Sequence, residues 1–254
     1  LNASGRLENA LESLRLLCTE NEDRALKIAE KLNSLNLERQ ELTKASVDLA
    51  LSITQGKSLS KINVAVHEDF HEGIIGLVAG KLVSHFGTPA VVISKGEEFS
   101  KASARSVEGF NIVEFLRSLG PHFENIGGHA GAAGFTIRTE RIEEFLRTLN
   151  SYQEGLEIPL PLLKIERELQ FEDINYDLLE LLKKLAPFGI GNQEPLFLSR
   201  KVLVESETFV GSRKTHLKLS LSVNGKSHSA IFFGKGELYK DLARRNQISN
   251  LEDY

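Results

Sequence analysis

The sequence contains no methionine and a single cysteine, and none of its apolar runs approaches the length that crosses a membrane. Because Cys18 has no second cysteine to pair with, an internal disulfide and a multi-cysteine metal site are both excluded. A reducing, cytoplasmic location fits this usage best. The first residues, 1–6, show neither a basic segment before an apolar run nor a small-residue cleavage pattern, so nothing supports secretion. Since the chain begins at a leucine and lacks methionine, we expect a fragment of a longer protein.

Composition and charge favour a folded protein with an uneven electrostatic surface. Apolar residues make up 41% of the 254 residues and charged residues 26%, as in globular domains and unlike disordered chains. This length allows two modest domains, each with its own core. The net charge of −4 argues against a general attraction to nucleic acid. However, residues 196–240 hold 8 bases and 3 acids, whereas residues 140–185 hold 6 bases and 11 acids, so the last third is locally basic.

The first two thirds of the chain alternate helical and strand-like patterns. Apolar residues at helical spacing predict helices over 7–17 and 25–32, and a long helix from 35 to about 56. The pattern then predicts strands and helices in alternation, which is typical of an α/β domain. The strands are expected at 62–67, 90–94, 99–103 and 135–138, and the helices at 73–86, 112–119 and 142–149.

The last third has the pattern of a small barrel. Residues 154–161 hold a glycine and two prolines and are predicted to be a linker. Beyond it, alternating apolar residues over 163–171 predict a strand with one buried face, followed by a helix at 176–185 and a turn-dense stretch at 187–195. Asn224-Gly225 separates strand patterns at 217–223 and 229–233, a strong hairpin signal. Such spacing fits a Greek-key barrel, of which the OB-fold is the commonest nucleic-acid-binding form.

The most unusual stretch is Gly127–Gly134, in which eight residues hold four glycines and three alanines. With no bulky side chains to shield it, its backbone can approach a ligand closely, as in loops that bind phosphate. We therefore expect a phosphate-binding loop. His129 is the only side chain in it that can donate a hydrogen bond, carry charge or pass a proton near neutral pH. The alternative is a tight turn packed against a sheet.

Two further stretches could bind anions. His71 and Gly73 precede a predicted helix, whose N-terminus attracts negative charge. Ser103 and Arg105 end a predicted strand and share one face of it, because strand side chains repeat every two residues. A hydroxyl beside a guanidinium suits a phosphate, since the fork offers paired donors. The alternatives are a helix cap for His71 and a surface pair for Ser103 and Arg105.

In their order along the chain, these stretches resemble the RecJ family of single-strand-specific exonucleases, members of the DHH phosphoesterase superfamily. The resemblance covers nearly the whole chain. It is carried by 2–7 (NASGRL), 71–79 (HEGIIGLVA), 103–106 (SARS), 127–134 (GGHAGAAG) and 185–195 (LAPFGIGNQEP). It implies a helical linker from a missing N-terminal DHH catalytic domain at 1–57, a DHH-associated α/β domain at 58–153, and an OB-fold domain at 160–254 that is incomplete at its C-terminus.

The resemblance also implies a function. The intact protein is expected to be a 5′→3′ single-stranded DNA exonuclease that hydrolyses phosphodiester bonds in DNA repair and recombination. Its partners would be single-stranded DNA and other repair proteins, with no membrane and no small-molecule cofactor. This chain would grip the strand and its 5′ end, with His129 in a catalytic role. The implied substrate-binding residues are Arg6, His71, Ser103, Arg105, Gly127, Gly128 and His129.

The residues that bind catalytic metal in this superfamily are not found here. The sequence has no Asp-His-His triplet, and its seven histidines are not accompanied by an aspartate cluster of metal-ligand type. The segment 67–71 (HEDFH) comes closest. We therefore expect Mn²⁺ or Mg²⁺ to be bound by the missing domain, no metal to be bound by this chain, and the chain alone to be inactive.

Three other hypotheses about the function remain open. A DHH-type phosphodiesterase of short oligonucleotides or cyclic dinucleotides shares a Gly-Gly-His loop, but such enzymes usually lack an OB-fold, so residues 163–233 speak against it. A non-catalytic DNA-binding scaffold is disfavoured by the presence of His129, Ser103 and Arg105. An α/β domain of unrelated function leaves the order of the motifs unexplained.

The barrel supplies its own set of expected nucleic-acid contacts. Basic side chains there are expected to contact phosphates: Arg213, Lys214, Lys218 and Lys226. Phe209, Phe232 or Phe233 is expected to stack on bases. The alternative is that these phenylalanines belong to the core, as aromatic residues on strands commonly do.

Overall fold

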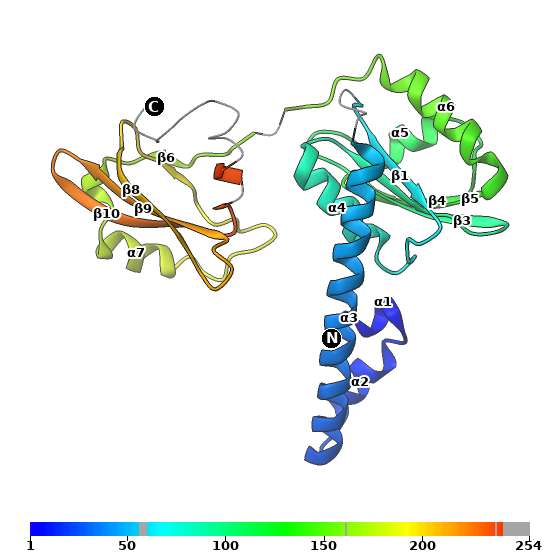
Figure 1. The fold of residues 1–254 in the computed structure, drawn as a ribbon, viewed down its shortest axis with the longest axis horizontal. Helices are drawn as coiled ribbons and strands as arrows, with labels where there is room; N and C mark the ends of the chain where they lie inside the picture. The colour runs from blue at the N-terminus through cyan, green and yellow to red at the C-terminus, as the bar shows by residue number, and fades with distance from the viewer. Residues whose placement is uncertain (56–59, 161, 237, 241–254) are drawn as a thin grey trace. The chain divides into compact units, whose positions relative to one another are not determined.

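The computed structural model describes residues 1–55, 60–160, 162–236 and 238–240. The chain divides into two compact units, Leu1–Pro161 and Leu162–Tyr254, which are described separately (Figure 1). Unit 1 joins an N-terminal helical segment to a five-stranded sheet with helices on both faces. Unit 2 consists of short strands and one helix of regular length. No helix in the described part of the chain is long and apolar enough to span a membrane.

The N-terminal segment contains α1 (Ser4–Leu7), α2 (Leu11–Cys18) and α3 (Glu22–Thr54). The prediction of two helices after Cys18 was wrong, because α3 is one helix of 33 residues. The polar residues between its two apolar rows cost only a few tenths of a kcal/mol each inside a helix, so they do not interrupt it. Asn21 begins the helix by accepting a hydrogen bond from the Arg24 N–H. Figure 1 shows α1 and α2 beside the N-terminal half of α3.

The sheet confirms the predicted α/β domain. Its strand order is β1-β2-β3-β5-β4, with β1 and β2 parallel and the other pairs antiparallel. Helix α4 connects the parallel pair, as the hydrophobic pattern predicted. The strands are β1 (Asn63–His67), β2 (Ala90–Ser94), β3 (Phe99–Arg105), β4 (Phe123–His129) and β5 (Ala132–Arg138), and the helices are α4 (Ile75–Phe86), α5 (Ile112–Ser118), η1 (Thr139–Arg141) and α6 (Ile142–Gln153).

The two faces of the sheet are covered unequally. Val91 and Ile93 pack in a large apolar core with α5 and α6. Their neighbours Ala90 and Val92 point the opposite way and pack in a second core with α4 and the C-terminal half of α3. On this second face the helices cover β1 and β2 and reach β3, whereas the side chains of β4 that share it are exposed. A sheet face without a helical cover is therefore available beside the start of α4.

Unit 2 contains a three-stranded antiparallel sheet, β10-β9-β8, and a separate parallel pair, β6 with β7. The hairpin predicted across Asn224-Gly225 is confirmed, and both residues have positive φ angles, 51° and 81°, as a type I′ turn requires. The elements are β6 (Arg167–Glu168), η2 (Phe171–Asp173), α7 (Tyr176–Lys183), β7 (Phe197–Leu198), β8 (Leu203–Val210), β9 (His216–Val223) and β10 (Lys226–Phe232).

The predicted strand over 163–171 was wrong. Only Arg167 and Glu168 form a strand, and Leu163 is 72% exposed, although Phe171 is buried as expected. The alternating pattern is present, but β7, its only partner strand in the described part of the chain, is two residues long, so most of the segment remains unpaired. The incomplete C-terminal closure of the barrel that we expected concerns residues 241–254, which lie outside the described residues.

Two glycines near α4 allow a prediction about stability. A Cβ on Gly73 would lie 1.8 Å from the carbonyl oxygen of Arg6, whereas a Cβ on Gly80 would meet no atom within 4 Å. We expect Gly73→Ala to lower the free energy of unfolding by about 1–3 kcal/mol, because the α1 backbone must move. Gly80→Ala should raise it by about 0.5–1 kcal/mol through helix propensity. Urea denaturation followed by circular dichroism measures both, and equal effects would contradict the close approach of α1.

Candidate phosphate-binding site

A pocket of about 310 Å³ lies where the start of α4 meets β3. Arg6 reaches it from α1, and Ser103 and Arg105 reach it from the end of β3. Arg105 follows Ser103 by two residues, so both side chains point to the same side of the strand, as predicted. The structure thus brings together three of the residues that the sequence indicated as substrate-binding.

The two guanidinium groups of this pocket have no acidic partner among the residues that the structure describes. Arg105 Nη1 donates to Ser103 Oγ (3.2 Å) and to the Ala104 carbonyl (2.8 Å), and Arg6 Nη1 donates to the Gly73 carbonyl (3.3 Å). Within the described residues no carboxylate lies within 4.0 Å of either group. Burial, and then the positive charge of Arg6, lower the pKa of Arg105. Two like charges that share a half-buried pocket repel one another, so an anion between them would be stabilising.

The start of α4 adds backbone donors to the same pocket. No side chain caps this helix, and no described residue accepts from the N–H groups of Ile75 and Gly76. Gly76 also leaves the space that Arg105 occupies, because a Cβ there would lie 2.9 Å from Arg105 Nη2 and 3.1 Å from Ser103 Oγ. Free N–H groups and the helix dipole favour negative charge at this point.

Sequence reasoning missed four other polar side chains that line this pocket. Glu72 and Lys101 form an ion pair of 2.6 Å, and Asn125 and Thr136 contribute from β4 and β5. Asn125 and Thr136 each lie two residues from a glycine of the 127–134 stretch, so strand periodicity would have placed them on the same face. The shared face could be predicted only if segment 127–134 was recognised as strand, whereas we predicted a loop there.

The glycine-rich segment 127–134 is a hairpin, which corrects the predicted phosphate-binding loop. Residues 127–129 end β4, residues 132–134 begin β5, and only Ala130 and Gly131 form the turn between them. The hairpin is possible because Gly128 has a φ of 144°, and a Cβ there would lie 2.2 Å from the Ala132 carbonyl oxygen. The backbone is therefore paired within the sheet, and the free loop amides that we expected are not its main contribution.

These glycines leave the sheet surface beside the pocket free of bulky side chains. Ser103 pairs with Gly134, which pairs with Gly127, so the three lie in one row across the sheet. A Cβ on Gly127 would meet no atom within 4 Å. Directly paired residues of antiparallel strands share a face. We call the uncovered side of β4 and β5 the open sheet face: Asn125, Gly127, His129, Ala132, Gly134 and Thr136.

His129 lies on the open sheet face, at a distance from the pocket. It pairs with Ala132, which pairs with Arg105, so its backbone is two strand spacings, about 10 Å, from that of Arg105. The side chain is exposed, and Nδ1 accepts a hydrogen bond from the Gly131 N–H (3.2 Å). The neutral ring therefore carries its proton on Nε2, which is free to donate to a ligand on this face.

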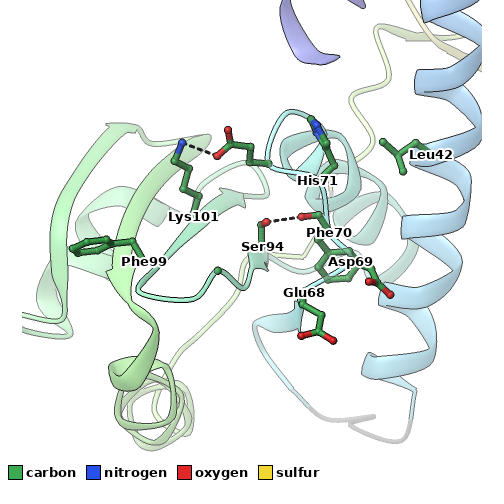
Figure 2. A pocket seen from close by; sticks show the side chains of 10 residues that line it. Leu42, Glu68, Asp69, Phe70, His71, Ser94, Phe99 and Lys101 are labelled. Carbon is green, nitrogen blue, oxygen red and sulfur yellow. Dashed lines mark hydrogen bonds and ion pairs between the residues drawn. The ribbon is translucent and has the colours of Figure 1, made fainter. Parts of the chain in front are cut away.

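His71 belongs to a neighbouring pocket of about 490 Å³ (Figure 2). This second pocket lies between α3, represented by Leu42, and the loop that follows β1. His71 Nδ1 accepts from the Gly73 N–H (3.0 Å) and so shapes the turn before α4. The structure therefore does not bring His71 into the pocket of Arg105, and its observed contact is the turn-stabilising one.

The described residues do not fit a Mn²⁺ or Mg²⁺ ion. No group of three or more His, Cys, Asp or Glu side chains is arranged for a metal in the part of the chain that the structure describes. The segment 67–71 came closest in the sequence. There, His67 Nδ1 lies 3.5 Å from an Asp69 carboxylate oxygen and accepts from the Asp69 N–H. Both ions require several oxygen ligands around one point, which this pair does not supply.

The four basic residues predicted to bind the strand in unit 2 do not form a single cluster. Arg213 and Lys214 lie in the turn between β8 and β9, and Lys218 follows near the start of β9. Lys226 pairs with Val223 at the other end of the hairpin, roughly 17 Å along the strand from Lys218. Val223 is five residues from Lys218, so Lys218 and Lys226 lie on opposite faces.

The three phenylalanines of unit 2 differ in exposure. Phe232 is 49% and Phe233 is 70% exposed, so their rings are accessible for stacking on bases. Phe209 is partly buried, with the Tyr239 ring 6.1 Å away and Lys240 over its face. Burial, and then a hydrogen bond to Glu207 and the charge of that carboxylate, raise the pKa of Tyr239 to about 12. Because it is partly buried and packs against Tyr239 and Lys240, Phe209 is the least available of the three rings for base stacking.

Comparison with known proteins gives a matching family model for each of the two units. A family model described as the DHHA1 domain matches residues 59–155, and one described as the RecJ OB domain matches residues 165–251. The chain is 32% identical to the single-stranded-DNA-specific exonuclease RecJ of Bacillus subtilis, over 98% of this chain and 32% of that protein. It is 29% identical to RecJ of Haemophilus influenzae, over 96% of this chain and 45% of that protein.

A solved RecJ structure is also similar to this chain. The crystal structure of RecJ in complex with Mn²⁺ from Thermus thermophilus matches with a TM-score of 0.78 and 28% identity, over 90% of this chain and 34% of that one. The fold is thus a DHHA1-type α/β domain followed by an OB domain. The chain belongs to the RecJ family. It spans about a third to under a half of the length of the curated relatives named above.

Proposed function

We propose that this chain is the strand-gripping part of a metal-dependent 5′→3′ single-stranded DNA exonuclease. In this proposal the pocket of Arg6, Ser103 and Arg105 seats the 5′-terminal phosphate. The observation that carries the proposal is the pair of guanidinium groups that share one pocket without a carboxylate partner among the described residues. The curated relatives are single-stranded-DNA-specific exonucleases, which supports single-stranded DNA as the ligand.

A terminal phosphate fits this pocket better than an internal linkage. It carries a charge of about −1.5 to −2 at neutral pH and exposes three acceptor oxygens. Arg105 and Arg6 supply two positive charges, and Ser103 Oγ and the free N–H groups at the start of α4 supply further donors. An internal phosphodiester carries a single charge and two free oxygens, so it would leave part of this set unsatisfied.

The strand would then cross the open sheet face toward His129. Gly127 and Gly134 leave that face flat beside Ser103, and His129 stands in the same row as Arg105. His129 does not line the pocket of Arg105, and its backbone is about 10 Å from that of Arg105, so in this proposal it contacts the next linkage and not the terminal phosphate. In this proposal Nε2 of His129 donates to the scissile phosphodiester and offsets the charge that develops on its oxygens.

In this proposal the metal ions are bound outside this chain. The described residues do not fit such ions, and the matching Thermus thermophilus structure is of RecJ in complex with Mn²⁺. We propose that a DHH catalytic domain outside this chain binds Mn²⁺ or Mg²⁺, which supplies the attacking hydroxide when bound. This chain binds and orients the strand. Interactions with other repair proteins and a cytoplasmic location form part of the same proposal.

Unit 2 would bind another part of the same strand. The match to the RecJ OB domain favours this role over a cyclic-dinucleotide phosphodiesterase. The end of the hairpin that carries Arg213, Lys214 and Lys218 is the more basic one, and the exposed Phe232 and Phe233 provide stacking surfaces. Lys226 stands apart, so it would contribute less.

The first prediction of the proposed function concerns the terminal phosphate. We expect Arg105→Ala to weaken binding of 5′-phosphorylated single strands by about 1.5–3 kcal/mol, the range for a hydrogen bond to a charged group. Strands with a 5′ hydroxyl should be affected much less. A competition assay by fluorescence anisotropy measures both, with Arg117→Ala on the opposite side of the sheet as the control. Equal weakening of both ligands would make the pocket a general backbone contact.

The second prediction concerns catalysis. We expect the purified chain to leave single-stranded DNA intact in the presence of Mn²⁺, because its described residues hold no metal site that could generate the nucleophile. Gel analysis of a 3′-labelled strand tests this. Degradation that is lost on His71→Ala would revive a metal site at 67–71 and refute this division of labour.

The third prediction concerns unit 2 and salt. The slope of log K against log salt should be about −0.7 for each phosphate contacted on a single strand. Lys218→Gln should therefore make the slope shallower by roughly 0.7, whereas Lys226→Gln on the other face should change it less. Affinity that hardly depends on salt, or that survives deletion from Leu160 onward, would argue against strand binding by unit 2.

A further inference from the structure

The pocket of Arg105 and the pocket of Figure 2 share one wall. Glu72 and Lys101 line both, and Lys101 Nζ lies 2.6 Å from a Glu72 carboxylate oxygen; Figure 2 marks this ion pair at Lys101 with a dashed line. The pair therefore stands as a partition between the two cavities. On its far side the second pocket carries two more carboxylates, Glu68 and Asp69, which Figure 2 labels. A basic pocket and an acidic pocket thus adjoin at a single ion pair.

The position of the partition along β3 is informative. Lys101, Ser103 and Arg105 are successive side chains on one face of the strand, roughly 7 Å apart. Lys101 stands on one side of Ser103, and Arg105, with His129 in its row, stands on the other. A strand that leaves the phosphate pocket toward His129 therefore has the ion pair behind its 5′ end.

We propose that the Glu72–Lys101 ion pair is a specificity barrier that admits a single terminal phosphate and rejects any further phosphate on the 5′ side. This inference rests on the proposed function. Within the pair, Lys101 neutralises Glu72, so the guanidinium groups of Arg6 and Arg105 remain for one phosphate. A second phosphate would have to draw Lys101 away from Glu72 and approach the bare carboxylate. Like charges brought next to one another repel, and such a juxtaposition disfavours the ligand that causes it.

The pair can be altered without harm to the fold. The side chains of Lys101 and Glu72 are 59% and 55% exposed, and exposed ion pairs contribute little to stability. Neither residue belongs to an apolar core. Replacement by glutamine keeps the shape of Glu72 while it removes the charge.

The test compares 3′-labelled oligonucleotides of one sequence that carry a 5′ hydroxyl, monophosphate or triphosphate, bound to the whole chain in EDTA. A simple basic patch would favour the triphosphate, which has the most charge. The barrier predicts that the monophosphate binds about tenfold more tightly than the triphosphate, and that Glu72→Gln abolishes this preference. Lys101→Gln, which leaves Glu72 without its partner, should enlarge the preference. Glu143→Gln on α6 is the control.

Each outcome decides between the two proposals. Preference for the triphosphate by the unaltered chain would overturn the barrier, while the terminal-phosphate pocket stands if the monophosphate still exceeds the hydroxyl. Equal binding of hydroxyl and monophosphate would overturn the proposed function itself. If Glu72→Gln and Glu143→Gln changed the preference equally, the effect would be one of overall charge and the barrier would be refuted.

Discussion

The close approach of α1, α4 and β3 at Gly73 and Gly76 is the constraint on which the site depends. At Gly73 the missing side chain lets the Arg6 carbonyl lie against the turn before α4, and at Gly76 it lets the Arg105 guanidinium lie over the first turn of the helix. Three segments far apart in the sequence therefore direct positive charge and free N–H groups to one point. Larger residues at either glycine would separate them, and the two guanidinium groups, which have no carboxylate partner among the described residues, would no longer share a pocket.

Because of the sheet register, this pocket lies at one end of the open sheet face. Because β3, β5 and β4 pair without offset beyond Asn125, the residues of the pocket and those of the glycine-rich hairpin fall into matching rows. A bulge between Phe123 and Asn125 lies before these rows and does not disturb them. The helices that cover this face stop at β3, so the rows remain exposed on β4 and β5.

Sequence reasoning reached the elements of unit 1 and part of the site. Two-residue periodicity was sufficient to place Ser103 and Arg105 on one face, because it depends only on strand geometry. Arg6 was indicated by resemblance alone, since nothing local marks a residue of α1 as a neighbour of α4. The position of His129 could not be derived, because it follows from which strands pair and in what register. Glycines normally weaken strands, so the 127–134 segment was read as a loop although an exposed hairpin tolerates them. In unit 2 the alternating pattern over 163–171 was real, but alternation predicts a strand only where a partner strand of similar length exists.

Charge balance explains why such a site would distinguish the end of a strand from its middle. The pocket offers two guanidinium groups whose charges are not balanced by described carboxylates, and one lysine whose charge is balanced by Glu72. A terminal phosphate brings nearly two negative charges and so matches the unbalanced pair, whereas an internal linkage brings one. With one charge, part of the repulsion between Arg6 and Arg105 remains. Burial, and then this repulsion, already lower the pKa of Arg105. In the proposed function, preference for a strand end would therefore require no contact with a base, because it would follow from the two guanidinium charges that have no carboxylate partner among the described residues.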